Sequence, residues 1–505
     1  MGESQKPVLW SLALMKRGIL AISSVLVALG CGGGVEPEVA STPTVDAGPE
    51  TAPLPPQTLA LTTVSIYQTV GIPLFKDGAK VEARTAPVVA DRPAMFRVSV
   101  KPDAGWKRKR LTASLHLESK AGPVDLVDSK DIGVSGSIES DLETSFHWDL
   151  TREQVQLDTT WSVLIKNGDE VLAQYPAEGV DALAAKKSGA LKVKLVPVKW
   201  DTDGSGRVPS TSESTLQMYR DYLFAMYPVT SVEVTVREPF AWNQPVEAAG
   251  TGWDALLEAI VDLRNADGTP DDVYYYGLFK PAEQFYKYCK MGCVAGLSGL
   301  ISNPGDAFLR GSIGLGYGQE SAKTMAHEIG HAHGRAHAPC GGPDGVDKKF
   351  PYKDGSIGVF GWDLNDKRLI DSSYNDVMGY CDPNWISDYT YNALYNRVSY
   401  VSSRPFVFMP ETSSVRYRFV HVMPDGKLRW GKTTITRTAP TSDPHTVTYE
   451  AADGTKKSLT GFYYPYGDLG GGLMVVPEPL SASAPIRITI DGLPAGTDHV
   501  LNVPR

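Results

Sequence analysis

Apolar and polar residues alternate in short runs along residues 58–188, and turn-forming residues separate the runs. Residues 94–100 and 113–117 are two examples. Because successive side chains of a strand point to opposite faces of a sheet, such alternation is typical of strands with one buried face. The pattern predicts an N-terminal antiparallel β-sandwich domain over residues 58–188.

The pattern changes near residue 190, where strand-like and helix-like segments begin to follow one another. Strands are expected at residues 191–198, 232–236 and 273–279, and helices at residues 212–227, 253–263 and 320–333. This succession predicts a mixed sheet covered by helices over residues 189–403. Short alternating runs then return, for example at residues 415–422 and 486–490, and predict a C-terminal β-domain over residues 404–505.

Residues 1–31 have the form of an export signal. Two basic residues precede an apolar run over residues 18–29 that is too short to span a bilayer. Gly30 and Cys31 follow the run, and residues 28–31 resemble a bacterial lipobox, which implies that Cys31 is lipidated and becomes the mature N-terminus. An ordinary secretory signal cut nearby is the alternative. Residues 32–57 are rich in Pro, Ala, Thr and Gly, and predict a flexible linker.

Composition and charge narrow the class of protein. Hydrophobic residues make up 42% of the chain and charged residues 21%, as in ordinary globular proteins. The net charge is −9 without a long basic run, which gives no indication of nucleic-acid binding. No later segment is apolar enough to cross a membrane, so we expect membrane contact through the lipid anchor only. The chain is thus expected to be an outer-membrane or cell-surface lipoprotein, or alternatively secreted.

Residues 327–337 read His-Glu-Ile-Gly-His-Ala-His-Gly-Arg-Ala-His and contain the spacing HExxHxxGxxH. His327 and His331 are four residues apart, so on a helix they share one face and can bind one zinc ion. Gly334 can adopt a positive φ, end the helix and turn the chain so that His337 supplies the third ligand. Glu328 then lies beside the metal as a base.

Simpler explanations of these residues exist. A bare HExxH can be a surface helix with two solvated histidines, and a structural zinc ion usually has four protein ligands, often cysteines. Three histidines leave one position open for water, which is typical of a catalytic site. Calcium at residues 201–206 is only weakly indicated, because the downstream acidic ligand is missing and a plain turn explains the run.

The long motif resembles the zinc signature of the metzincin metallopeptidases. That superfamily has a tight methionine turn beneath the metal, and residues 375–380, Asn-Asp-Val-Met-Gly-Tyr, match it with Met378 as the Met-turn residue. Tyr380 follows two residues later, as in the astacin-like and serralysin-like branches, where such a tyrosine can bind zinc and stabilise the transition state. A packed loop tyrosine is the alternative for Tyr380.

The resemblance covers roughly residues 190–400. It implies an α+β metzincin-like catalytic domain, a mixed twisted sheet with helices, flanked by the β-sandwich domains. It also implies one catalytic Zn²⁺. Residues 360–363 are faintly similar to large secreted mucin-cleaving metzincins. In metzincins an edge strand before the zinc helix binds the substrate backbone. The substrate-binding candidates here are Ser312, Ile313, Gly314 and Leu315 of that strand, together with Trp385 after the Met-turn.

Four cysteines remain after Cys31, and an even number in an exported chain suggests disulfides. Cys289 and Cys293 are four residues apart and can close a small loop. Cys340 follows the zinc motif and Cys381 follows the Met-turn, so Cys340–Cys381 is the preferred second bridge. Three pairings are possible, and a second zinc ion bound by the four thiolates is a competing interpretation.

These features predict a zinc-dependent endopeptidase that hydrolyses extracellular proteins or glycoproteins, with a metal-activated water and Glu328 as general base. The alternative from another class is an envelope-anchored adhesin or glycan-binding protein with a non-proteolytic zinc domain. A third possibility is a latent protease in which residues 58–188 act as a pro-domain.

Overall fold

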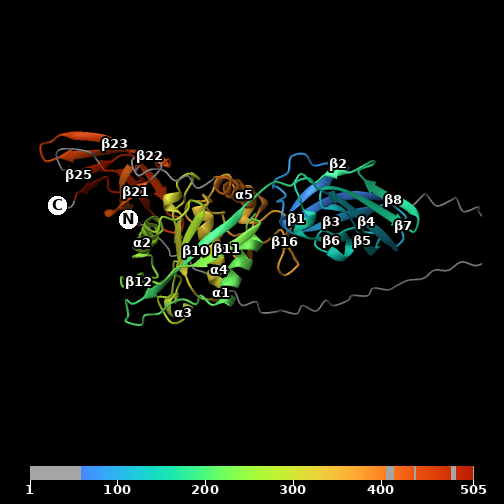
Figure 1. The fold of residues 1–505 in the computed structure, drawn as a ribbon, viewed down its shortest axis with the longest axis horizontal. Helices are drawn as coiled ribbons and strands as arrows, with labels where there is room; N and C mark the ends of the chain where they lie inside the picture. Colours follow the sequence, from blue (N-terminus) through green and yellow to red (C-terminus); the bar gives the residue numbers. More distant parts are fainter. Residues whose placement is uncertain (1–57, 405–414, 437–438, 479–484, 504–505) are drawn as a thin grey trace, which may run out of the picture.

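The computed structural model describes residues 58–404, 415–436, 439–478 and 485–503 (Figure 1). The expected signal peptide with Cys31, and the expected linker over residues 32–57, lie outside the described residues. Within the part of the chain that the structure describes, no helix is long and apolar enough to cross a membrane.

The N-terminal strands form two antiparallel sheets that face each other. One sheet has the order β17-β16-β1-β3-β6 and the other β5-β4-β7-β8. Phe96 of the first sheet packs against Trp161 of the second with ring centroids 5.2 Å apart, so the inner faces share a core. The strands are β1 Leu59–Lys76, β2 Ala79–Lys80, β3 Ala94–Pro102, β4 Lys109–Ser119, β5 Gly122–Ile132, β6 Phe146–Leu150, β7 Thr160–Asn167, β8 Glu170–Tyr175, β9 Asp181–Ala182, β16 Gly361–Asp363 and β17 Arg368–Ile370.

Two strands of the first sheet come from a distant part of the chain. The β16–β17 hairpin follows the zinc motif in sequence, yet β16 pairs with β1, with Gly361 opposite Val70 (Figure 1). Nearby, Trp385 Nε1 donates a hydrogen bond to the carbonyl oxygen of Thr69 at 2.9 Å. The N-terminal sandwich is therefore joined to the middle of the chain by a shared sheet.

The central sheet has the order β11-β10-β13-β15-β14. Its strands are parallel except for β14, which pairs antiparallel with β15 at the edge. Gly277 of β13 lies against Ile260 of α2, whereas Gly314 of β15 lies against Thr324 of α4 on the opposite face. Helices therefore cover both faces. The elements are β10 Ala190–Trp200, α1 Glu213–Met226, β11 Ser231–Val236, β12 Phe240–Trp242, α2 Trp253–Ala266, β13 Val273–Phe279, α3 Phe285–Tyr288, β14 Gly296–Ser298, β15 Gly311–Leu315, α4 Gly318–Ala332, β18 Asn375–Asp376, β19 Asn384–Trp385 and α5 Asp388–Ser402.

The predicted fold class, an α+β metzincin-like domain with flanking sandwiches, is wrong for this chain. Strands hold 41% of the chain and helices 17%, and the curled sheets give a predominantly β, sandwich-like architecture. The physical reason is the limited extent of helical periodicity. Four helices of more than one turn occur among the described residues, all between residues 213 and 402, whereas residues 333–387 form only short strands, turns and a single 3₁₀ turn.

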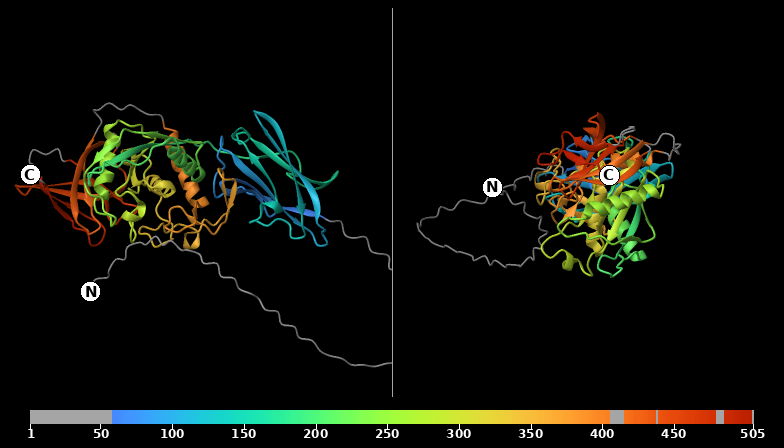
Figure 2. Two further views of the ribbon diagram at one scale, coloured as in Figure 1. Left: turned by 90° about the horizontal axis from the view of Figure 1, so that it is seen from below. Right: turned by 90° about the vertical axis from the view of Figure 1, so that its left-hand side faces the viewer.

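The C-terminal strands form one seven-stranded antiparallel sheet, on the far side of the central sheet from the N-terminal sandwich (Figures 1 and 2). Neighbouring residues of β20 have different surroundings, since Phe419 packs into the core that continues from the central sheet and Val420 packs into a separate cluster. One face of this sheet is therefore docked. The strands are β20 Val415–Val422, β21 Leu428–Thr436, β22 Asp443–Ala451, β23 Lys456–Pro465, β24 Gly472–Pro477, β25 Pro485–Ile490 and β26 Val500–Asn502.

Candidate metal centre

Helix α4 carries the first half of the histidine motif. His327 and His331 lie on one face of the helix, and their Nε2 atoms are 3.0 Å apart. After the helix ends, Gly334 has a φ of +80°, a conformation that favours glycine, and an added Cβ there would lie 2.8 Å from a main-chain oxygen. The chain turns at this point, and the ring centroid of His337 lies 4.7 Å from that of His331.

Each of the three imidazole rings is oriented through its Nδ1 atom by a main-chain carbonyl. The pairs are His327 with Val377 at 2.7 Å, His331 with Arg335 at 2.6 Å, and His337 with Asp344 at 2.5 Å. Because a carbonyl oxygen can only accept, the proton of each neutral ring stays on Nδ1 and leaves a lone pair on Nε2. Three such Nε2 atoms that face one point suit a transition-metal ion.

A fourth potential ligand comes from Asp468, in the loop between β23 and β24. Its carboxylate oxygens lie 3.3 Å from His327 Nε2, 3.4 Å from His331 Nε2 and 3.4 Å from His337 Nε2. Ligand atoms of all four residues lie within 4.8 Å of one another. Asp468 Oδ2 is buried and has no hydrogen-bond partner. A cation between the carboxylate and the imidazoles would satisfy it, so the residues present fit a metal ion.

Asp468 is not among the residues predicted from the sequence. It lies 131 residues after His337, so no motif spacing connects it with the histidines. The available signal is weak: one acidic residue in the glycine-rich run 467–472 between two apolar strands.

Glu328 lies against the main chain of β14. An added Cβ on Gly296 would be 2.2 Å from Glu328 Oε1, so the carboxylate occupies space that only a glycine leaves free. The residue is 2% exposed, and its Oε2 atom has no hydrogen-bond partner. This oxygen is therefore positioned to interact with a water molecule or a substrate beside the metal centre.

Burial and the charges of its neighbours control the ionisation of the site. Burial, together with the carboxylate of Asp468, raises the pKa of Glu328 well above its ordinary value. Burial alone would also raise the pKa of Asp468, but the three histidines hold that pKa well below its ordinary value. Burial lowers the pKa of His331 to about 4, which keeps the ring in the neutral form that binds metals.

Residues 375–380, which were expected to form the Met-turn, lie directly beneath helix α4. An added Cβ on Gly330 would be 2.5 Å from Met378 Sδ, so the thioether packs closely under α4. The buried carboxylate of Asp376 accepts hydrogen bonds from Met378 N and Ser387 N, both at 2.9 Å, and holds the turn in place. Since Val377 orients His327, this turn supports the ligand geometry.

Tyr380 lies beside the cluster and contacts Asp468 and the ring of His337. Its hydroxyl donates a hydrogen bond to Asp468 Oδ1 at 2.7 Å, and its ring centroid is 5.0 Å from that of His337. Burial, and then the charge of Asp468, raise the pKa of the Tyr380 hydroxyl far above its ordinary value. The hydroxyl therefore stays protonated and remains a hydrogen-bond donor.

The residues expected to form the substrate-binding edge lie elsewhere. Ser312, Ile313, Gly314 and Leu315 belong to β15, which is an inner strand because β13 and β14 pair with its two sides. The edge strand is β14, residues 296–298, which is too short to show periodicity in the sequence. Trp385, expected in the substrate pocket, is 5% exposed and packs against Gly361 and Thr69 of the first N-terminal sheet.

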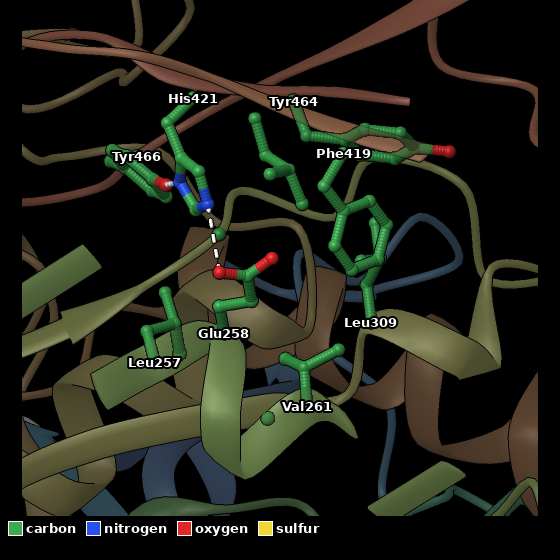
Figure 3. A pocket seen from close by; sticks show the side chains of 11 residues that line it. Leu257, Glu258, Val261, Leu309, Phe419, His421, Tyr464 and Tyr466 are labelled. Carbon is green, nitrogen blue, oxygen red and sulfur yellow. Dashed lines mark hydrogen bonds and ion pairs between the residues drawn. The ribbon is translucent and has the colours of Figure 1, made fainter. Parts of the chain in front are cut away.

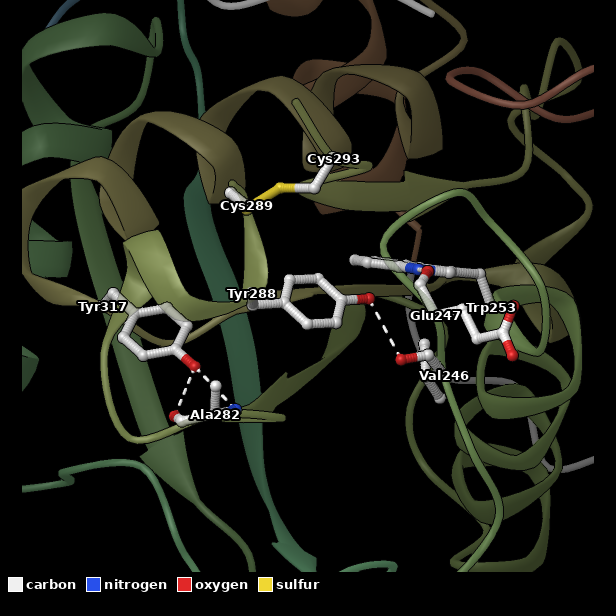
Figure 4. The surroundings of a disulfide bond; sticks show 8 residues. All are labelled: Val246, Glu247, Trp253, Ala282, Tyr288, Cys289, Cys293 and Tyr317. Atoms are coloured by element: carbon white, nitrogen blue, oxygen red, sulfur yellow. Dashed lines mark hydrogen bonds between the residues drawn. A yellow bond between two sulfur atoms is a disulfide. The ribbon is translucent and has the colours of Figure 1, made fainter. Parts of the chain in front are cut away.

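Among the described residues the structure contains two disulfides, Cys289–Cys293 and Cys340–Cys381, in the pairing preferred from the sequence. Cys340–Cys381 joins the segment after the zinc motif to the segment after the Met-turn. Cys289–Cys293 closes a small loop near Tyr288, whose hydroxyl donates to Val246 O at 3.1 Å (Figure 4).

The turn over residues 201–206 closes on itself. The carboxylate of Asp203 accepts hydrogen bonds from Arg207 at 2.5 Å and from the Ser205 hydroxyl at 2.6 Å. These contacts engage the acidic group within the turn, in agreement with the plain-turn interpretation.

Comparisons with known proteins support a peptidase. The family described as Peptidase M66 matches residues 299–389, which include the three histidines, Glu328 and the Met-turn. The comparison with curated proteins found no match. Among solved structures, the β-glucuronidase (GUS) of Parabacteroides merdae is similar over 44% of this chain and 28% of that chain, with 8% identity and a TM-score of 0.14. This chain thus covers less than a third of that protein, and so low a similarity carries no argument.

Proposed function

We propose that this chain is a zinc-dependent endopeptidase that hydrolyses peptide bonds of extracellular proteins or glycoproteins. One observation carries the proposal: three Nε2 atoms, each oriented through Nδ1, face one point beside the buried carboxylate of Glu328. The reaction is assigned to residues 189–403, with residues 58–188 and 404–505 as flanking β-domains.

The chemistry requires a metal, a base and an oxyanion donor. A zinc ion held by His327, His331 and His337 supplies Lewis acidity for the hydrolysis. Glu328 accepts a proton from the attacking water and then passes the proton to the leaving amine. The protonated hydroxyl of Tyr380 donates a hydrogen bond to the oxyanion that develops on the scissile carbonyl.

The substitution Glu328→Gln tests this mechanism. It removes the base but keeps the size of the side chain, so cleavage is expected to fall by about 10²–10⁴-fold. Bound zinc should remain stoichiometric by elemental analysis, because Glu328 is not one of the ligands. Glu320→Gln, at an exposed position of the same helix, is the matched control and should cleave like the native protein.

Two results would contradict the proposal. Full cleavage by the Glu328→Gln variant would exclude Glu328 as the base. Stoichiometric zinc without cleavage of any member of a protein and glycoprotein panel, by the native chain and by the variant of Asp468 described below, would favour the adhesin or glycan-binding alternative.

We further propose export and attachment to the membrane through a lipid on Cys31. Two disulfides support an oxidising compartment, where such bonds persist. Cys31→Ala should move the protein from the membrane fraction to the soluble fraction of cells. Mass spectrometry of the native N-terminal peptide should detect a diacylglyceryl group on Cys31, and an unmodified peptide would exclude the anchor.

A further inference from the structure

The loop between β23 and β24 pairs with the edge of the central sheet. Leu300 N donates to Pro465 O at 2.8 Å, and Gly467 N donates to Ser298 O at 2.9 Å. Between these two hydrogen bonds, Gly299 and Tyr466 form an antiparallel bridge. The segment 465–467 therefore continues the sheet beyond β14, in the manner of an extended peptide that adds to a sheet edge.

The same segment then enters the metal centre. Gly467 contacts the imidazole of His331, and an added Cβ would be 2.4 Å from His331 Cδ2. The next residue, Asp468, places its carboxylate against the Nε2 atoms of the three histidines and accepts the hydrogen bond of Tyr380. An extended backbone along the edge strand and a polar oxygen at the metal are the two features that a bound peptide substrate would present.

We propose that residues 465–468 are a built-in blocking segment, which occupies the substrate strand position and closes the open coordination position of the metal with the Asp468 carboxylate. This inference rests on the proposed peptidase function. The structure then represents a self-inhibited state of the enzyme.

The geometry distinguishes a blocking ligand from a purely structural one. A structural four-ligand site has no use for a further carboxylate beside it. Here Glu328 is buried and interacts with the neighbouring Asp468 carboxylate. Its Oε2 atom lacks a hydrogen-bond partner, and Gly296 leaves space for the side chain. Glu328 is thus positioned to activate a water molecule, but the carboxylate of Asp468 fills the position that this water would take.

Contacts on both sides hold the blocking segment in place. Before the segment, the hydroxyl of Tyr464 donates to Asp306 at 2.7 Å. Within it, the hydroxyl of Tyr466 lies 2.9 Å from His421 Nδ1, and His421 Nε2 lies 3.1 Å from Glu258 of α2 (Figure 3). Tyr466 thus ties the segment to the docked face of the C-terminal sheet.

The C-terminal sheet contacts α2 through one acidic face of the helix. Asp254, Glu258 and Asp262 recur every four residues and therefore share a face of the helix. Their partners in the C-terminal sheet are Arg429 for Asp254, His421 for Glu258 and Lys432 for Asp262. Because the segment is part of the same chain, its local concentration at the metal is high, and a free substrate competes poorly with it.

The test uses the full chain with Co²⁺ or Zn²⁺ bound, and two variants. Asp468→Ala removes the carboxylate, and Gly467→Ala keeps the carboxylate but clashes with His331. Asp498→Ala, at an exposed acidic position in the loop between β25 and β26, is the matched control. The first readout is the affinity for acetohydroxamate, a small metal-binding ligand, measured through the visible absorption of the Co²⁺ proteins.

We expect Asp468→Ala and Gly467→Ala to bind acetohydroxamate at least about tenfold more tightly than the native chain and the control. Cleavage of protein substrates by the Zn²⁺ forms should rise by a similar factor, with one zinc retained per chain. Loss of the metal from Asp468→Ala would overturn the proposal and make Asp468 a structural ligand. Unchanged acetohydroxamate affinity in both variants would also overturn it. Tighter acetohydroxamate binding without cleavage by any form would support the blocking segment and contradict the proposed peptidase function instead.

Discussion

Single glycines determine how closely the main chain approaches the functional side chains. Gly296 lies against Glu328, and Gly330 lies against Met378. The three histidines could be recognised from the sequence because their spacing acts through one helix and the turn that follows it. The role of Gly296 could not, because its partner is 32 residues away in the chain and meets it only when β14 and α4 pack together.

Gly296→Ala should impair the base without removing the metal. The new Cβ would lie 2.2 Å from Glu328 Oε1, so the carboxylate must move. A misplacement of about 1 Å can reduce turnover by about 10²-fold, which we expect for kcat with zinc content unchanged. Gly299→Ala is the control, since its added Cβ meets nothing within 4 Å. Equal kcat in the two variants would show that Glu328 does not need this space.

At the scale of elements, local patterns predicted what a segment forms and missed which segments become neighbours. The periodicity of residues 320–333 predicted the helix that carries His327 and His331, and α4 spans Gly318–Ala332. The edge strand was assigned to residues 312–315 because they precede this helix, whereas β14 takes the edge through an antiparallel pairing. That pairing depends on sheet order, which a three-residue strand does not reveal in sequence.

The stability of the segment between His337 and Met378 should depend on the Cys340–Cys381 disulfide. Replacing Cys340 and Cys381 by Ser frees a loop with a sequence separation of 41, and loop entropy predicts a loss of about 4 kcal/mol in the free energy of unfolding. Zinc affinity should also fall, since Cys340 O accepts a hydrogen bond from Tyr380 N at 2.9 Å.

Denaturant titration and a competitive zinc titration would measure the two effects. The double Ser variant of Cys289 and Cys293 is the comparison, because a separation of 4 predicts a smaller loss of about 2 kcal/mol and no effect on zinc. A larger loss of zinc affinity in this second variant would contradict a role of Cys340–Cys381 in supporting the metal centre.

At the scale of the whole molecule, strand alternation predicted β-structure on both sides of residues 189–403. It did not predict that the chain as a whole is mostly β, nor that the C-terminal sheet docks on α2. The acidic face of α2 looks like an ordinary solvated face in sequence. Asp254 and Glu258 are buried there only because His421 and Arg429, more than 150 residues later, cover them.

The contact between α2 and the C-terminal sheet should weaken in acid. Burial raises the pKa of Glu258, but His421 and Lys432 together lower it by more than burial raises it. The pKa therefore lies below its ordinary value of 4.5. The folded state therefore binds fewer protons than the unfolded state, and this contribution to stability is present above about pH 4.5 and lost as the pH falls through the lowered pKa.

Glu258→Gln should lower the melting temperature at pH 7 and flatten its decline between about pH 5 and pH 3. Differential scanning calorimetry across this range would measure both, with Glu238→Gln, at an exposed position, as control. Parallel declines of the melting temperature in the two variants would contradict the assignment of this acid sensitivity to Glu258.

The pairing of β16 with β1 limits how this protein can be shortened. A chain that began at residue 189 would lack β1, so β16 would present an unpaired main-chain edge, and Trp362 would lose the side chains of Tyr67 and Met95 that cover it. We therefore expect a chain that begins at residue 189 to aggregate, and a chain that begins at or before Leu59 to stay monodisperse in size-exclusion chromatography.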